Sequence, residues 1–296
     1  MDESDRERTL LDIKKALELF PEVLKRKKRA FLHKRSILKK FESVSREVVR
    51  LQAKGVPVQA HPWRLCPLGE HWVSEHKVSV KESAKNPSGK TTRSGHCRKN
   101  RSKKDQLYRD EMSEIARIHF RNLTRLPAPN PLGARNGNQY DSLIGGWTQY
   151  WNDVLKPSET LDPNLVKALI STESDFNSTA KILASKGNWA RGLTQLTDQT
   201  LKILKDEKGD LKNFLINLDQ GDATDPNLNI AAGIRWLFHK KDLLEKKQKK
   251  SATWIDAVME YKGYTRDLQK RDASAIVQRD KFLERLAALS KKNEAK

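Results

Sequence analysis

Residues 161–177 read LDPNLVKALISTESDFN, and this stretch decides the fold of the C-terminal half of the chain. Asp162 can cap the first free N–H groups of a helix, and Pro163 suits the first helical position. Counted in threes and fours, three apolar residues and one glutamate then share a single helix face: Val166, Leu169, Ile170 and Glu173. The pattern therefore predicts a buried helix with a carboxyl group at the end of its apolar face.

A glutamate in that position suits acid catalysis. Contact with apolar groups raises the pKa of a carboxyl group, and a general acid near neutral pH requires a raised pKa. The alternative is that the helix frays at this end and the side chain of Glu173 turns into water. The spacing alone leaves both interpretations open.

The composition favours one core and an anionic partner. The chain has 296 residues, a net charge of +20, 36% hydrophobic residues and 32% charged residues. The hydrophobic fraction is low, so a core through the whole length is not expected. A charge this positive indicates binding to nucleic acid, a membrane surface or an anionic cell wall.

The sequence contains no apolar run of membrane-spanning length. Residues 1–15, MDESDRERTLLDIKK, lack the apolar core of a secretory signal. We therefore expect synthesis in the cytoplasm without a Sec export signal.

The chain divides into five expected segments and is mainly α-helical. The segments are a basic helical region at 1–54, a basic Cys/His hairpin module at 55–104, a helix and linker at 105–141, the main helical domain at 142–271, and a charged helix at 272–296.

The first segment contains a dense basic run, KRKKRA at 25–30. This run could bind phosphate groups, but the solvated face of a helix pair explains it better.

The hairpin module combines strand-like alternation with positive charge. Apolar and polar residues alternate from Trp72 to Val80. From Lys77 to Lys104 there are ten Lys or Arg residues against one acid, Glu82. Adhesion to an anionic polymer is the expected role.

The same module holds both cysteines of the chain. Two Cys and two His residues in a short segment without a core fit a structural zinc site, with Cys66, His76, His96 and Cys97 as the ligand set. Neighbouring residues in a strand point to opposite faces, which argues against His96 and Cys97 as joint ligands. The alternatives are a Cys66–Cys97 disulfide or two free thiols.

Four short motifs follow one another in the main helical domain: ESDFN at 173–177, GLTQL at 192–196, NIAAGIRWL at 229–237 and YKG at 261–263. Gly192 permits close backbone approach, Gln195 offers a donor and an acceptor, and Thr197 could cap a helix. Taken singly, the motifs are as well explained by a turn, by helix packing, or by a core tyrosine with a hydrated hydroxyl.

Together and in this order, the motifs resemble the soluble lytic transglycosylase (SLT) family, over residues 142–265. The resemblance implies a lysozyme-like helical catalytic domain and an enzyme that cleaves the β-1,4 bond between N-acetylmuramic acid and N-acetylglucosamine in peptidoglycan. Glu173 would protonate the glycosidic oxygen and then deprotonate the C6 hydroxyl, which closes a 1,6-anhydro ring. No cofactor is implied for catalysis. Asp175 and Asp198 are candidates for a second acid in a hydrolytic, lysozyme-like variant.

The resemblance also suggests substrate-binding residues. Gln195 would bind an acetamido group or hold Glu173, and Tyr261 would orient the acid. Trp189 could form the floor of a sugar subsite or belong to the core. Ser174 and Asn229, within the matched motifs, complete the set.

The sequence departs from the family pattern at several points. Thr194 replaces a methionine, and Trp189 stands where glycine is common. The spacing from Ala180 to Gly192 is longer than usual. Lys262 replaces the asparagine after Tyr261, and one residue is missing there, which bears on the role of Tyr261 and not on the acid.

A different class of function also fits the charge. The chain could be a nucleic-acid- or wall-binding virion or structural protein with an inactive lysozyme-like domain. Retention of Glu173 on a buried face favours the enzyme. A wall-cleaving enzyme without an export signal would need another route to the cell wall or periplasm, such as a bacteriophage virion or lysis system or a specialised secretion system.

Overall fold

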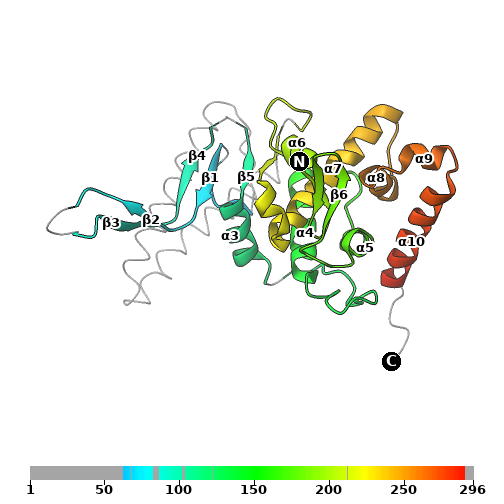
Figure 1. Ribbon diagram of the computed structural model, residues 1–296, viewed down its shortest axis with the longest axis horizontal. Helices are drawn as coiled ribbons and strands as arrows, with labels where there is room; N and C mark the ends of the chain where they lie inside the picture. Colours follow the sequence, from blue (N-terminus) through cyan, green and yellow to red (C-terminus); the bar gives the residue numbers. More distant parts are fainter. Residues whose placement is uncertain are drawn as a thin grey trace, which may run out of the picture. The chain divides into compact units, whose positions relative to one another are not determined.

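The structure is a computed structural model that describes residues 63–290, except 68, 83–86, 102–103, 122 and 212 (Figure 1). These residues lie within one compact unit of the chain. The basic helical region expected at 1–54 lies outside the described residues.

The C-terminal part of the described chain is a helical body with α7 at its centre. Helix α7 packs against α3 (Arg109–His119), α4 and α8, and helix α10 packs against α5. Trp147, Tyr150 and Trp151 of α4 are buried in the core. The helices are α4 (Asp141–Leu155), α5 (Pro163–Ser174), α6 (Asp198–Leu204), α7 (Pro226–Gln248), α8 (Trp254–Tyr261), α9 (Thr265–Gln269) and α10 (Ala273–Ser290), with a short 3-10 helix, η1 (Gln220–Thr224).

This arrangement confirms the mainly helical prediction for the C-terminal half and the charged C-terminal helix over residues 273–290. Within the described residues, none of the helices combines the length and the apolar character needed to cross a membrane.

The predicted helix caps are present. The side chain of Asp162 accepts a hydrogen bond from the backbone N–H of Asn164 at 2.8 Å, and Pro163 is the first residue of α5. Thr197 accepts one from the N–H of Thr200 at 3.0 Å and so caps α6. These local signals fixed where the two helices begin.

A small antiparallel sheet, not predicted from the sequence, follows α5. Its strands are β6 (Lys181–Ser185), β7 (Asn188–Arg191) and β8 (Leu196–Thr197), in that order. The long spacing between Ala180 and Gly192 is explained by the β6–β7 hairpin, whose turn contains Gly187 at φ 71°. The additional residues of this chain therefore extend a sheet beside the second motif.

The hairpin module forms two antiparallel strand pairs (Figure 1). Strand β1 (Glu70–Val73) pairs with β4 (His96–Lys99), and β2 (His76–Ser79) pairs with β3 (Lys90–Arg93). The prediction of a short basic hairpin is confirmed.

The helix expected from residue 105 begins later. Gln106–Tyr108 form strand β5, which pairs in parallel with β9 (Leu215–Asn217), and helix α3 covers Arg109–His119. Leu107 in the strand is only 2% exposed. Pairing with a distant strand, invisible to local periodicity, overrides the helical pattern at these three residues.

The Pro- and Gly-rich stretch at 126–139, expected to be a linker, packs against the helical body. Lys167 of α5 is fully buried, and its ammonium group donates to Ala128 O at 2.9 Å and to Asn138 Oδ1 at 2.7 Å. Its ion pair with Asp141 Oδ1 measures 2.8 Å. A buried ammonium group needs such acceptors, so Lys167 holds the stretch in place.

Candidate active site

Glu173 lies near the C-terminal end of α5 with its side chain only 16% exposed. The residues that share its helix face, Val166, Leu169 and Ile170, are almost completely buried. The prediction that this carboxyl group lies at the end of a buried face is confirmed. The helix does not fray at Glu173, because its last turn is ordered up to Ser174.

The chain turns sharply directly after Glu173. Asp175 and Phe176 both adopt left-handed backbone conformations, with φ values of 50° and 61°. Such conformations are costly for residues other than glycine and persist where the surroundings enforce them. Here Phe176 is buried in the core, and Ser174 Oγ lies 2.8 Å from Leu193 O as a hydrogen-bond donor. The turn thus fastens the first motif to the second.

Lys262 forms an ion pair with Glu173. Its Nζ atom lies 2.5 Å from Glu173 Oε1, and the Lys262 side chain is 6% exposed. Lys262 directly follows α8, at the position where the SLT pattern has asparagine. This departure is visible in the sequence, but the ion pair was not predicted; the basic residue itself was the signal for it.

Tyr261 contacts the second motif, GLTQL at 192–196. Its hydroxyl donates a hydrogen bond to Thr194 O at 2.6 Å. Burial, and then the nearby charge of Glu173, raise the pKa of Tyr261. The pKa of Tyr264 is raised by the same two causes. Because the single hydroxyl proton of Tyr261 is used on Thr194, Tyr261 positions the second motif and does not donate to the acid.

The second motif packs closely against η1 and α7. Gly192 has φ 74°, and a Cβ atom there would lie 2.2 Å from Ala223 O, which confirms the predicted need for glycine. Gln195 is half-buried at φ 51°, and its Nε2 atom donates to Gly192 O at 2.8 Å. In this structure the Gln195 side chain therefore braces its own turn and makes no hydrogen bond with Glu173.

Asn229 is a structural residue, and its prediction as a substrate-binding residue is wrong. The side chain is 0% exposed. Its amide group donates to Arg191 O and Ala223 O, and its carbonyl oxygen accepts from the backbone N–H and the hydroxyl of Thr194. With all these groups satisfied in the core, Asn229 cannot contact a sugar, but it does hold the second motif on α7.

Trp189 lies on β7 and is half-buried. Lys181 Nζ lies 4.6 Å from the centroid of its ring, so one ring face carries a cation. The predicted sugar subsite at Trp189 stays a prediction.

The two candidates for a second acid differ in their surroundings. Asp198 is buried and forms an ion pair with Arg191. Burial alone would raise the pKa of Asp198, but hydrogen bonds from Arg191 and from the N–H of Trp189 hold it below its usual value. Asp175 is exposed. The carboxylate of Asp198 is therefore held in its ion pair with Arg191, whereas the side chain of Asp175 faces solvent.

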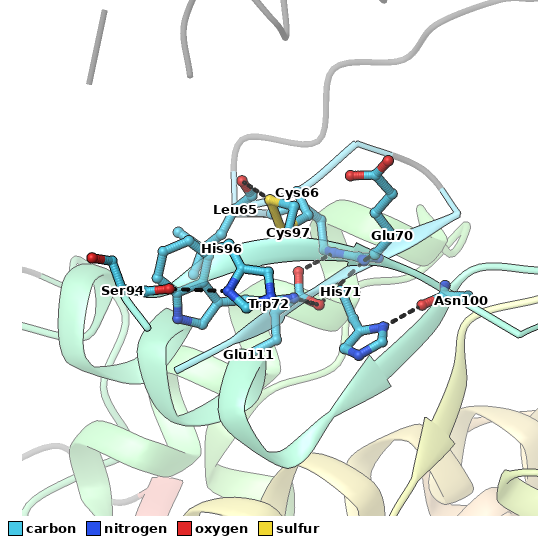
Figure 2. The surroundings of a disulfide bond; sticks show 11 residues. Leu65, Cys66, Glu70, His71, Trp72, Ser94, His96, Cys97, Asn100 and Glu111 are labelled. Atoms are coloured by element: carbon cyan, nitrogen blue, oxygen red, sulfur yellow. Dashed lines mark hydrogen bonds and ion pairs between the residues drawn. A yellow bond between two sulfur atoms is a disulfide. The ribbon is translucent and has the colours of Figure 1, made fainter. Parts of the chain in front are cut away.

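The predicted zinc site is wrong, because its two cysteine ligands are bonded to each other. Cys66 and Cys97 form a disulfide with a Cα–Cα distance of 5.6 Å (Figure 2). Sulfur atoms in a disulfide have no thiolate to offer a metal. His76 and His96 have ring centroids 6.0 Å apart. Among the described residues, no three His, Cys, Asp or Glu side chains gather into a group able to hold a metal ion.

The helical body places the partly buried side chain of Glu173 at the end of α5. Residues 152–278 match the family model described as the transglycosylase SLT domain. The C-terminal half of the chain thus contains an SLT domain. No curated protein and no solved structure matches the chain.

This family consists in general of lytic transglycosylases that act on peptidoglycan. The match supports an enzyme of that class, with the cell wall as its place of action.

Proposed function

We propose that the protein is a peptidoglycan lytic transglycosylase with Glu173 as its general acid and base. Protonated Glu173 donates to the oxygen between N-acetylmuramic acid and N-acetylglucosamine, and the C1–O bond breaks. The resulting carboxylate takes the proton of the muramoyl C6 hydroxyl, whose oxygen then bonds to C1. The proton is thereby returned to Glu173, and no water or cofactor is consumed. The observation that carries the proposal is the partly buried position of Glu173.

The surroundings of the carboxylates favour this reaction over hydrolysis. A retaining or inverting hydrolase commonly needs a second carboxylate across the scissile bond. Asp198 is held by Arg191, and Asp175 is exposed beyond the turn after α5. Glu173 therefore supplies both proton transfers in the proposed mechanism.

Lys262 has a distinct role in the proposed cycle. Its ammonium group lies 2.5 Å from Glu173 Oε1 and so fixes the orientation of the carboxyl group. Lys262 is thus a positioning residue that acts through Glu173.

The remaining substrate contacts come from the predicted set. Gln195 is half-buried. Its side-chain amide would bind an acetamido group of the substrate after its hydrogen bond to Gly192 O breaks. The ring of Trp189 would support a sugar ring beside the sheet. Ser174 acts indirectly, because its hydroxyl is used on Leu193 O.

The test is mass spectrometry of sacculi digested with the wild type, Glu173→Gln and Asp175→Asn. The wild type and Asp175→Asn should release muropeptides one water lighter than lysozyme products, and Glu173→Gln should release none. The amide replaces the acid without changing its size, and Asp175 provides a carboxylate control two residues away.

Two outcomes would contradict the proposal. Products of normal mass that depend on Glu173 would indicate a lysozyme-type hydrolase. Absence of soluble products from every variant would favour the second candidate function, a nucleic-acid- or wall-binding virion or structural protein with an inactive domain, which the net charge of +20 supports. Delivery by a phage or mobile element remains part of either proposal.

A further inference from the structure

The two strand pairs of the hairpin module form one continuous ribbon. His71 pairs with Arg98 and His76 with Arg93, so both pairs keep the same antiparallel register across the break between them. The N–H of Val80 donates to Gly89 O at 2.8 Å, which extends the pairing beyond β2. At about 3.3 Å per residue, the strand from Glu70 to Val80 spans roughly 33 Å. We name residues 70–81 and 89–99 the basic ribbon.

The base of the basic ribbon is fixed to the helical body. The disulfide ties β4 to Cys66, and the N–H of Ser74 donates to Asp110 Oδ2 of α3 at 2.9 Å (Figure 2 shows the disulfide end). Arg64 forms a buried ion pair with Glu111 of α3 at 2.7 Å. The ring of Trp72 occupies the space above Gly95, where a Cβ atom would lie 2.3 Å from it. A ribbon with almost no core of its own is thereby held firmly at one end.

Cations project from both faces of the basic ribbon. By strand alternation, Lys77 and Arg98 lie on one face, and Arg93 and Lys99 lie on the other. All four side chains are exposed, as is Lys81. Within the described part of the chain, none of these five cations forms an ion pair with a carboxylate. Their charge is therefore available to an external partner.

The exposed cations of the ribbon and its lack of exposed Phe, Tyr or Trp side chains indicate the chemistry of that partner. A stiff duplex lying along the ribbon would meet one face, whereas a flexible chain can contact both. Single-stranded nucleic acid is typically gripped by aromatic side chains that stack on its bases. Of Phe, Tyr and Trp, the basic ribbon contains only Trp72, whose ring packs over Gly95 at the fixed end. Recognition through backbone charge alone fits a flexible polyanion without bases.

We infer that the basic ribbon binds a flexible phosphodiester polymer of the bacterial cell wall, a polyol-phosphate chain, and so holds the SLT domain near its substrate. The choice of a wall polymer rests on the proposed function, because that function places the protein at the wall. The electrostatic contact itself rests only on the ribbon.

The exposed cations of the ribbon have a second explanation that does not involve binding. A two-stranded ribbon has two open edges, and charged residues there prevent pairing with other strands. That explanation predicts no dependence of polymer binding on the ribbon charges, whereas the inferred contact requires it.

The experiment measures binding of synthetic poly(glycerol phosphate) to the full-length, oxidised protein carrying Glu173→Gln, over a range of salt concentrations. One variant adds Lys77→Gln, Lys81→Gln, Arg93→Gln and Arg98→Gln. The matched control instead adds glutamine at four cations that are also exposed but lie outside the ribbon: Lys208, Lys250, Lys270 and Lys281. Both variants lose the same net charge. Equal circular dichroism spectra would show that both are folded.

The ribbon variant should bind at least about tenfold more weakly at moderate salt, and its log–log salt slope should fall by about 2 to 3, since each lost phosphate contact removes about 0.7. The control should change by less than about threefold in affinity. Equal losses in both variants, or no loss in either, would overturn the inference. A ribbon-dependent preference for single-stranded or duplex DNA of equal charge would overturn the choice of polymer. None of these outcomes depends on whether the protein cleaves peptidoglycan.

Discussion

The helical body and the basic ribbon use lysine in opposite ways. Lys167 and Lys262 in the body are buried and paired with carboxylates, one to hold a loop and the other beside Glu173. Lys77 and Lys81 in the ribbon are exposed and project into solvent. A buried cation contributes to structure or chemistry because its partners are fixed, whereas an exposed one contributes long-range attraction. The residue type is the same, and burial decides its function.

The largest expected effect concerns the buried lysines of the helical body. Lys167→Met should lower the free energy of unfolding by about 3–5 kcal/mol, because it leaves the partly buried Asp141 carboxylate without its cation. Burial already lowers the pKa of Lys167 and raises that of Asp141. The matched control, Lys77→Met on the ribbon, should change it by less than about 0.5 kcal/mol. Urea unfolding followed by tryptophan fluorescence measures both, and similar values for the two variants would contradict the comparison.

The second prediction separates the ribbon from the body. Removal of the disulfide by Cys66→Ser with Cys97→Ser should lower the stability of the docked ribbon by about 3 kcal/mol, since it frees a loop of 31 residues. Limited trypsin digestion should then cut the ribbon first, while release of muropeptides by the body persists. Protection equal to that of the oxidised wild type would mean that Arg64 and Trp72 hold the ribbon without the disulfide.

The smallest expected effect concerns the ion pair between Lys262 and Glu173. Lys262→Met removes the ammonium group that lies 2.5 Å from Glu173 Oε1, so the carboxyl group loses a contact that fixes its orientation. We expect kcat for release of muropeptides to fall by about tenfold while KM changes by less than about twofold, because the substrate contacts stay in place. Lys262→Arg, which keeps a cation at this position, should restore most of kcat. An equal fall in both variants, or a rise in KM without a fall in kcat, would reduce Lys262 to a packing residue.

Local signals predicted the parts of the site that depend on neighbours in sequence. The cap at Asp162 and the apolar spacing placed Glu173 at the end of a buried helix face, and Gly192 marked a close approach that the structure contains. The same reasoning failed for Asn229, because a matched motif does not reveal whether a side chain points to the substrate or into the core. It also failed for β5, whose partner strand lies more than a hundred residues further along the chain.

The sequence by itself determined the helical class of the C-terminal half, the position of Glu173 at the end of a buried helix face and the charge of the ribbon, because periodicity, capping and composition are local properties. Only the tertiary structure decided which partners those residues acquire. Glu173 meets Lys262 across 89 residues, and Cys66 meets Cys97 across 31. Such contacts depend on how helices and strands pack in three dimensions, and no local pattern encodes that packing.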